Sequence, residues 1–206
     1  MNMKIDKYEK IGKDKYRLFL SNGEVIDTYD NVILDNELLL KKELDSSLYN
    51  RIINETSFYD KYNIALKYIK VRLRSTKEIE EYLLRKKIEK EDIDLIVDKL
   101  TDTGNLNDDY FSKCFIKDKF RFTSWGPYRI KQELKKLGVD DKYINDNITI
   151  ITDEEIDEKL DKLINKQIKA NHGKLDNYKL KNKIYTNLVK LGYEASYVIN
   201  ILGEYL

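Results

Sequence analysis

The feature that most constrains the fold of this chain is an internal repeat. Three segments align without gaps, Leu83–Ile88, Leu134–Val139 and Leu188–Tyr193, and their first leucines are 51 and 54 residues apart. An isoleucine stands four residues before each first leucine, and an apolar residue stands five residues after each segment: Ile79, Ile130 and Ile184, then Ile93, Ile144 and Val198. Repeats of this length are typical of stacked helical units, so the sequence predicts three tandem three-helix units.

Helix-start signals recur at matching places. Ser75-Thr76-Lys77-Glu78 is a capping box that predicts the start of the second helix of the first unit. In the second unit Gly126 takes the place of Ser75, and Pro127 follows at the first helical position, where a missing N–H costs nothing. The third unit has no cap at the corresponding place, so we expect its second helix to begin earlier, near Asp176 or Asn177.

The first 45 residues follow a different pattern. Lys4–Ile11, Lys15–Leu20 and Glu24–Tyr29 mix β-branched, aromatic and charged residues in rough alternation. Asn22–Gly23, between the second and third segments, is a strong signal for a tight hairpin turn. We therefore predict a small antiparallel sheet of three strands that packs on the helices after it. The expected organisation is a sheet over residues 1–45, a linker helix with the first repeat over 46–105, and further repeats over 106–151 and 152–206.

Composition excludes several classes of function. The chain of 206 residues has one cysteine and one histidine, which argues against disulfide frameworks, zinc sites and a Ser-His-Asp triad. It has neither a run of about 18 apolar residues nor a Walker-type glycine-rich motif. We therefore expect a cytoplasmic, monomeric protein without membrane contact, cofactor or metal, and without enzymatic activity.

Charge alternates along the chain, although the net charge is only +1. Residues 61–90, 113–138 and 162–190 carry net charges of +6, +6 and +7, whereas residues 91–112 and 139–161 carry −6 and −7. The sequence thus predicts that the first two helices of each unit are basic and the third is acidic. One interpretation is that these runs are solvated faces that also provide contacts between units. The other is that stacking collects the basic helices on one face that binds a polyanion, such as a DNA backbone or an acidic groove of a DNA-binding protein.

The densest basic clusters define the candidate binding surface. Arginine in these clusters could make bidentate contacts to phosphate or carboxylate, and lysine would act as a point charge. The predicted partner-binding residues are Arg72, Arg74, Arg85, Lys86, Lys87, Arg121, Arg129, Lys131, Lys135 and Lys136.

Several of these segments resemble a known family. Leu73–Ile79, Leu106–Phe111 and Gly126–Leu134, with Lys136–Val139 after the last, closely resemble the regulatory protein RecX family. The resemblance covers about residues 58–206, and Lys87 departs from it by replacing the glycine found at Gly138 and Gly192. It implies tandem three-helix units in an elongated, curved body. It also implies a modulator of the RecA recombinase that lies along the RecA–single-stranded DNA filament and inhibits its action, with no catalytic residue.

Four other features have simpler structural interpretations. Cys114 lies among aromatic and aliphatic residues and is expected to be a buried structural thiol, and His172 is expected in a turn. Trp125 could stack on a nucleic-acid base, but a tryptophan that covers a helix end is commoner. Asp108 and Asp109 follow Asn107 at the expected start of a helix, as Asp153 follows Thr152. Acidic side chains at this place are stabilised by the positive end of the helix dipole, so we interpret them as helix-start residues rather than as a metal site.

Two functions remain open at this point. The first is a non-enzymatic regulator of the RecA filament. The second is a helical module that binds nucleic acid directly through its basic face and does not need RecA. Because DNA offers only negative charge, alternation of both signs in the chain favours a partner that presents both, which a protein-coated filament does.

Overall fold

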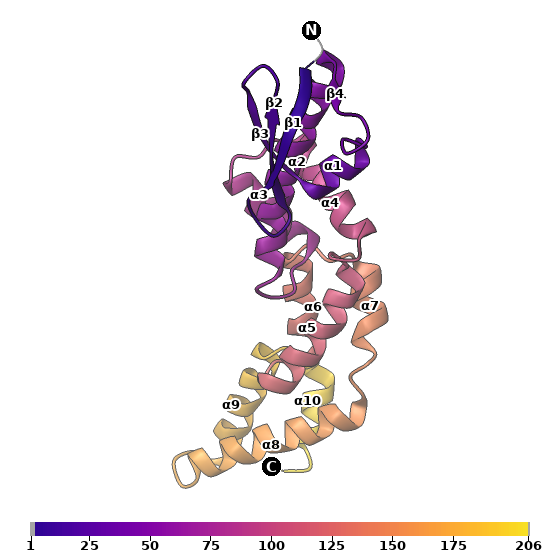
Figure 1. Ribbon diagram of the computed structural model, residues 1–206. Coiled ribbons are helices and arrows are strands. Elements are labelled where there is room, and N and C mark those ends of the chain that lie inside the picture. Colours follow the sequence, from indigo (N-terminus) through magenta and orange to yellow (C-terminus); the bar gives the residue numbers. More distant parts are fainter. Residues whose placement is uncertain (1–2, 206) are drawn as a thin grey trace. The chain divides into compact units, whose positions relative to one another are not determined.

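The structure is a computed structural model that describes residues 3–205 (Figure 1). The chain divides into two compact units. The first contains the described residues up to Arg72 together with Tyr82–Lys99, and the second contains Leu73–Glu81 together with the described residues from Leu100 onward. The predicted class is confirmed, since the described part is mainly helical and carries a small antiparallel sheet near its N-terminal end. The exact boundaries of the predicted domains stay a prediction.

The first unit begins with a four-stranded antiparallel sheet. Strands β1 (Met3–Lys10), β2 (Lys15–Leu20) and β3 (Val25–Tyr29) lie where the sequence predicts them. The prediction of three strands was incomplete, because β4 (Glu43–Leu44) pairs with the start of β1 and gives the order β3-β2-β1-β4. The tight turn is also present, with Gly23 in the left-handed region at a φ of 88°.

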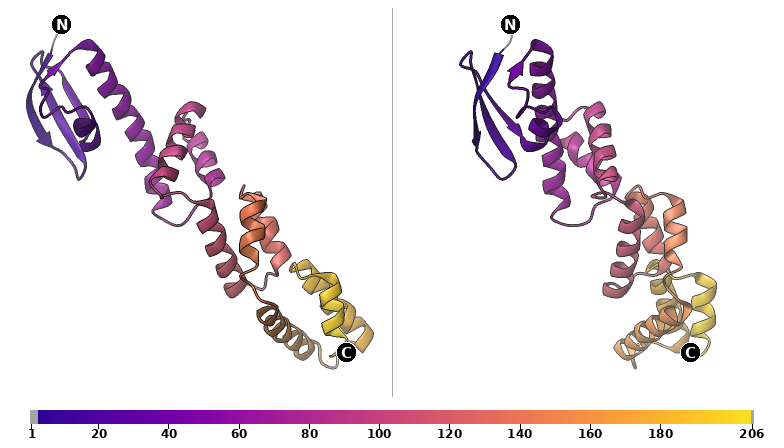
Figure 2. Two further views of the ribbon diagram at one scale, coloured as in Figure 1. Left: turned by 90° about the vertical axis from the view of Figure 1, so that its right-hand side faces the viewer. Right: turned by 45° about the vertical axis from the view of Figure 1, so that its right-hand side comes forward.

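Helices cover the sheet, as expected for a sheet too small to be stable alone. After α1 (Asp30–Asp35), the long helix α2 (Ser46–Ile69) runs beside the strands (Figure 2). Leu18, Leu20 and Ile26 of the sheet are buried, as is Ile52 of α2. The hydroxyls of Thr28 and Thr56 form a buried hydrogen bond of 2.6 Å that joins β3 to α2.

Helix α4 (Lys90–Asp102) packs against α2 within the same unit, and α3 (Thr76–Arg85) precedes it in the chain. The ammonium of Lys99 donates a 2.9 Å hydrogen bond to the Tyr59 hydroxyl and lies 4.8 Å from the centre of that ring. Lys61 forms an ion pair with Asp92. Cation–π and ion-pair contacts thus join the first and third helices of the first repeat.

The second unit holds two further three-helix groups. One consists of α5 (Asp108–Phe122), α6 (Pro127–Lys136) and α7 (Asp141–Ile148), and the other of α8 (Asp153–Asn171), α9 (Asn177–Lys190) and α10 (Ala195–Leu202). Each group has its own apolar core, the first around Ile116, Ile130 and Leu134 and the second around Ile164, Ile184 and Leu188. These residues share helical spacing on one side of each helix, and that spacing produces the cores.

The repeated sequence has a common structural cause in all three copies. The second helix of each of the three repeats ends in the same Schellman motif, in which N–H groups donate back to carbonyls near the helix end. The outer bond runs to the first leucine of the repeated segment, from Ile88 to Leu83 (3.2 Å), from Val139 to Leu134 (3.1 Å) and from Tyr193 to Leu188 (3.2 Å). These leucines are fully buried, as are the isoleucines four residues before them.

The motif needs a left-handed residue just before its last position. Gly138 and Gly192 occupy this place with φ of 78° and 92°. Lys87 takes the same conformation with a φ of 62°, so the fold keeps the backbone shape even where the sequence replaces glycine. A non-glycine residue in this region costs about 1–2 kcal/mol, which glycine avoids in the other two copies.

The predicted helix starts are confirmed. Ser75 and Glu78 form a reciprocal capping box, with hydrogen bonds of 3.1 and 3.3 Å. Gly126 is the N-cap of α6 with Pro127 after it, and Asn107 caps α5. In the third repeat Asp176 caps a helix that begins at Asn177, as the missing signal at the later position predicts.

Candidate partner-binding surface

The ten predicted basic residues come from both compact units. Arg72, Arg85, Lys86 and Lys87 belong to the first unit, and Arg74, Arg121, Arg129, Lys131, Lys135 and Lys136 belong to the second. The prediction of one continuous basic face therefore stays a prediction, and the two groups are described separately.

In the first unit the basic cluster lies at the end of α3. Arg85, Lys86 and Lys87 are exposed and form no ion pair with any residue between 3 and 205. Their position follows from the helix dipole, since cations are stabilised near the carbonyl end of a helix. The backbone turn at Lys87 ends the helix at the same point, so three basic side chains follow one another on an exposed corner.

Aromatic rings lie next to this basic corner. Tyr68 and Tyr82 are stacked with their centres 3.8 Å apart and their planes inclined by 9°. The ammonium of Lys86 lies 5.5 Å from the centre of the Tyr82 ring. Stacked aromatics beside basic side chains are a combination that single-stranded nucleic acids bind. The sequence predicted the charges here but not the stack, because Tyr68 and Tyr82 come from different helices.

Arg74 does not suit the predicted role. Its side chain is only 11% exposed, and its Nη1 atom lies 3.3 Å from a carboxylate oxygen of Glu78. The pairing follows from the capping box, because Glu78 sits in the first turn of α3, four residues after Arg74. Arg74 therefore holds the start of α3, and Arg72 remains the exposed arginine of this loop.

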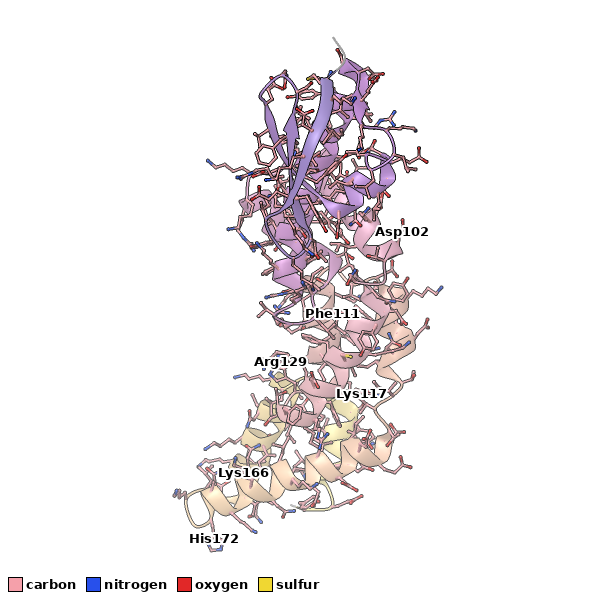
Figure 3. The ribbon with its side chains drawn as sticks, viewed as in Figure 1. Asp102, Phe111, Lys117, Arg129, Lys166 and His172 are labelled. Carbon is pink, nitrogen blue, oxygen red and sulfur yellow. The ribbon has the colours of Figure 1, made fainter. Side chains whose placement is uncertain are left out.

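In the second unit the predicted residues on α6 have partners of their own. Lys135 pairs with Asp141 at 2.7 Å, Lys136 pairs with Glu133 at 2.8 Å, and Lys131 donates to Asn145 at 3.3 Å. These contacts are exposed, so each is weak and can exchange for a stronger anionic partner. Figure 3 shows Arg129 on α6, where its guanidinium lies 4.5 Å from the centre of the Trp125 ring.

Two cationic side chains of the protein itself lie over the ring of Trp125. The ammonium of Lys119 lies 5.2 Å from the ring centre in addition to Arg129, and the backbone N–H of Trp125 donates to the Thr123 hydroxyl at 3.1 Å. The ring is half-buried at the loop between α5 and α6, which agrees with the expected role as cover for a helix end.

Arg121 borders a cavity of about 690 Å³ that the sequence did not predict. Lys117 and Lys162 add positive charge to its lining, and Glu155 and Glu158 add negative charge. Lys159, which is half-buried, also lines it, and its amine donates to the carbonyl oxygen of Phe120. Burial lowers the pKa of Lys159 to about 8. Only Arg121 was predicted here, because the cavity forms between α5 and α8, whose charges lie in separate sequence blocks.

The predicted distribution of charge by helix was wrong for the third repeat. Helix α10 contains no ionisable acidic or basic side chain, and α8 carries six acidic and four basic side chains. The acidic side chains of α8 fill its first half, and Lys162, Lys166 and Lys169 follow in the second half. Within α8 the charges thus follow the polarity of the helix, with acids near the N-terminus and bases near the C-terminus, as the helix dipole favours.

Residues that could carry other chemistry have structural roles. His172 is the C-cap of α8, in a turn as predicted (Figure 3). Cys114 is half-buried rather than fully buried. Asp109 forms an ion pair with Lys113 at 2.6 Å and accepts a hydrogen bond from Asn147. These two contacts hold the pKa of Asp109 below its ordinary value. Among residues 3–205, no group of three His, Cys, Asp or Glu side chains is placed to hold a metal ion.

Comparison with known proteins gives this surface its family context. Residues 62–100 match the first three-helix domain of RecX, and residues 107–146 match its second three-helix domain. The chain is also 29% identical over 207 residues to the regulatory protein RecX of Finegoldia magna, covering 99% of this chain and 96% of that protein. The chain belongs to the RecX family.

Other RecX proteins agree in sequence and in fold. The regulatory protein RecX of Oceanobacillus iheyensis is 25% identical over 201 residues, with 95% of this chain and 74% of that protein covered. A crystal structure of a regulatory protein RecX matches with a TM-score of 0.85 and 22% identity, over 98% of this chain and 99% of that one. The crystal structure of RecX from Lactobacillus salivarius matches with a TM-score of 0.66 and 28% identity, over 71% of this chain and 95% of that one.

The two matched RecX domains contain all ten predicted basic residues. The first includes the corner at Arg85, Lys86 and Lys87, and the second includes Arg121 and the basic residues of α6. The four-stranded sheet and the third three-helix group lie outside both matched ranges. Within the described part of the chain, no helix is both long and apolar enough to cross a bilayer.

Proposed function

We propose that this chain is a non-enzymatic regulator of the RecA recombinase, which binds along the RecA–single-stranded DNA filament and inhibits it in recombination and repair. Membership of the RecX family is the observation that carries the proposal, because curated relatives bear the name regulatory protein RecX and the family resemblance implies RecA as the target. A filament on chromosomal DNA places this action in the cytoplasm, and one copy with several repeats suffices, so we propose a monomer.

The charge pattern supports a partner of mixed charge. Arg85, Lys86 and Lys87 are available to phosphate or carboxylate groups, while Asp94 and Asp98 are exposed on α4 of the same unit. A DNA strand alone would be attracted to the first group and repelled by the second. A protein-coated strand presents both signs of charge and can satisfy both groups.

The second candidate function is direct binding of nucleic acid without RecA. The stacked Tyr68 and Tyr82 beside Lys86 favour it, because bases stack on such rings while the backbone contacts nearby cations. For this function the affinity for bare single-stranded DNA should fall with salt, at a log–log slope of about −0.7 per phosphate contacted.

One experiment separates the two functions. ATP turnover by RecA on single-stranded DNA is measured with and without this protein, and its binding to bare and RecA-coated oligonucleotides is measured by fluorescence anisotropy at physiological salt. We expect reduced turnover, weak binding to bare DNA and much tighter binding to coated DNA. Equal affinity for the two strands would overturn the regulator assignment in favour of direct DNA binding.

A triple reversal, Arg85→Glu, Lys86→Glu and Lys87→Glu, locates the contact. It should weaken inhibition of RecA without unfolding the protein, because the three side chains are exposed. The matched control reverses Lys7 and Lys10 on β1 and Lys13 in the loop after it, which changes the net charge by the same amount. Inhibition unchanged by the first triple variant, or reduced equally by both, would contradict a contact at the end of α3.

A further inference from the structure

A second cavity in the second unit has acidic and aromatic walls. It has a volume of about 450 Å³ and lies where the start of α6, the start of α8 and the loop before α10 meet. Its lining includes the rings of Tyr128 and Tyr197 and the carboxylates of Asp153 and Glu194. Tyr128 is exposed and Tyr197 is half-buried, so the aromatic walls face accessible space. We call this space the junction cavity.

The equivalent place one repeat earlier is closed by an internal hydrogen bond. There Asp108, the first residue of α5, accepts a 2.9 Å bond from the backbone N–H of Thr76, the first residue of α3. Burial raises the pKa of Asp108, and the bond to Thr76 offsets part of this effect. This carboxylate is therefore used within the fold.

At the junction cavity the same bond cannot form. Pro127 occupies the position equivalent to Thr76 and has no N–H to donate, while Asp153 occupies the position equivalent to Asp108. Asp153 is exposed, and its carboxylate makes no hydrogen bond or ion pair with any other described residue. The substitution of proline for threonine thus leaves one carboxylate free at the wall of a cavity.

The charged groups around the cavity leave it negative. Glu194 accepts one bond, from the Ser196 hydroxyl at 2.5 Å, and the Tyr197 hydroxyl donates to Asp157 at 2.6 Å. The hydrogen bond to Asp157 and, to a smaller degree, nearby charges including Asp153 raise the pKa of Tyr197 to about 12. The basic residue in the lining, Lys131, donates to Asn145 on α7.

We propose that the junction cavity receives an arginine side chain presented by a protein partner, an inference that rests on the proposed function only for the identity of that partner. Tyrosine faces attract cations, and a planar guanidinium can stack on a ring while it donates two hydrogen bonds to a carboxylate. Nucleic acid has no cationic group to place there. Tyr193 also lines the cavity, and its hydroxyl is buried without a hydrogen-bond partner among the described residues.

The test uses a minimal probe and the full chain. The peptide acetyl-Gly-Arg-Gly-amide is titrated into isotope-labelled protein, and amide chemical shifts are followed by NMR. The neutral isostere, with citrulline in place of arginine, serves as the ligand control. We expect saturable shifts confined to the surroundings of Tyr128, Asp153 and Tyr197 with the arginine peptide, and none with the citrulline peptide.

Two variants of adjacent residues test the role of the free carboxylate. Asp153→Asn should weaken binding of the arginine peptide about tenfold, the effect of losing one charged hydrogen-bond partner. Glu154→Gln removes the same charge from the next residue of α8, which does not line the cavity, and should change affinity less than about twofold. Binding of both peptides alike, no localised shifts, or equal effects of the two variants would overturn the proposal.

The two proposals fail in different ways. The peptide titration contains no RecA, so a negative result removes arginine recognition and leaves inhibition of RecA untouched. Absence of RecA inhibition by the wild-type chain would remove the proposed function, while specific binding of the arginine peptide would still identify the cavity as a protein-binding site.

Discussion

The backbone N–H of Gly126 donates a 2.7 Å hydrogen bond to the carbonyl oxygen of Leu191, which lies in the next repeat. The N–H of Tyr128 donates in the same way to the carbonyl of Gly192, at 3.0 Å. The N-terminus of α6 thus obtains acceptors for its free N–H groups from the loop that ends α9. One repeat earlier, the Ser75 hydroxyl donates to the carbonyl of Leu137 at 2.7 Å. The same loop of each following repeat therefore rests on the start of the preceding second helix.

This contact explains why the two caps differ. A methyl carbon added at Gly126 would lie 2.5 Å from the carbonyl oxygen of Gly192, so no side chain fits there. At Ser75 the loop that contains Leu137 leaves room for a side chain, and the Ser75 hydroxyl donates the hydrogen bond to the Leu137 carbonyl oxygen. In the sequence Ser75 and Gly126 are equivalent N-caps. In the structure, whether serine or glycine fits at this position depends on a loop some sixty residues later in the chain.

Alanine substitutions at the left-handed glycines should separate backbone strain from close contact. Gly104 and Gly173 have open space around them, so each Gly→Ala change should cost about 1–2 kcal/mol from the positive φ alone. Gly192→Ala would place its methyl carbon 2.4 Å from the backbone nitrogen of Arg129 and should cost about 3 kcal/mol or more. Urea unfolding followed by circular dichroism gives these values. A cost at Gly192 no larger than at Gly104 would contradict the packing of this loop against α6.

Truncation of a repeat-defining leucine should be strongly destabilising. Leu134 is fully buried in the core of the second repeat, and Leu134→Ala should lower the free energy of unfolding by about 2–5 kcal/mol. Leu84 lies on the exposed side of α3, and Leu84→Ala should change it by less than about 0.5 kcal/mol. Chemical denaturation of both variants compares them under one condition. Equal small effects would show that the repeated leucines do not carry the core.

Local sequence signals predicted the regular elements closely. The capping box at Ser75 and the earlier start of α9 at Asn177 depend on residues within one helical turn, so their signals are complete in the sequence. The Schellman ends of the second helices were not predicted, although they too are local. Strand β4 was missed because it has only two residues, too few for an alternating pattern, and exists through its pairing with Met3 and Lys4.

The candidate surface was less predictable for the same physical reason. Net charge per segment located the exposed corner at Arg85, Lys86 and Lys87, but it could not show that Arg74 is half-buried and paired with Glu78. The stack of Tyr68 on Tyr82 and the free carboxylate at Asp153 both arise between segments that are distant in sequence. Long-range packing, rather than composition, decides which charges remain available to a partner.

An acid-sensitive ion pair should stabilise the sheet. Arg17 on β2 is directly opposite Asp27 on β3 and donates two hydrogen bonds, of 2.7 and 2.9 Å, to its carboxylate. The hydrogen bond from Arg17 lowers the pKa of Asp27 below its ordinary value. A lowered carboxyl pKa means that the stabilisation is present at pH values above the ordinary carboxyl pKa and is lost as the pH falls through the lower pKa of the folded state.

Unfolding measured between pH 6 and pH 2 tests this pair. The wild-type protein should lose more stability than Asp27→Asn over the acid range, since the variant has no carboxylate to protonate there. Arg17→Met should reduce the difference by removing the donor. The effect is small because the pair is well exposed to solvent. Parallel pH curves for wild type and Asp27→Asn would rule out this contribution.

Reversal of the exposed acids on α4 should affect the two kinds of ligand in opposite directions. Asp94 and Asp98 flank Leu95, which is 57% exposed, so this side of α4 presents negative charge around an apolar side chain. A basic protein surface would be attracted to it, whereas bare DNA would be repelled. Asp94→Lys with Asp98→Lys should therefore weaken binding to RecA-coated strands and slightly strengthen binding to free single-stranded DNA. Both affinities are measured at the same salt concentration, because the DNA term alone varies steeply with salt. If the double variant strengthens binding to both ligands, the acids only oppose DNA, and the alternation of charge reflects helix polarity rather than a partner that carries both signs.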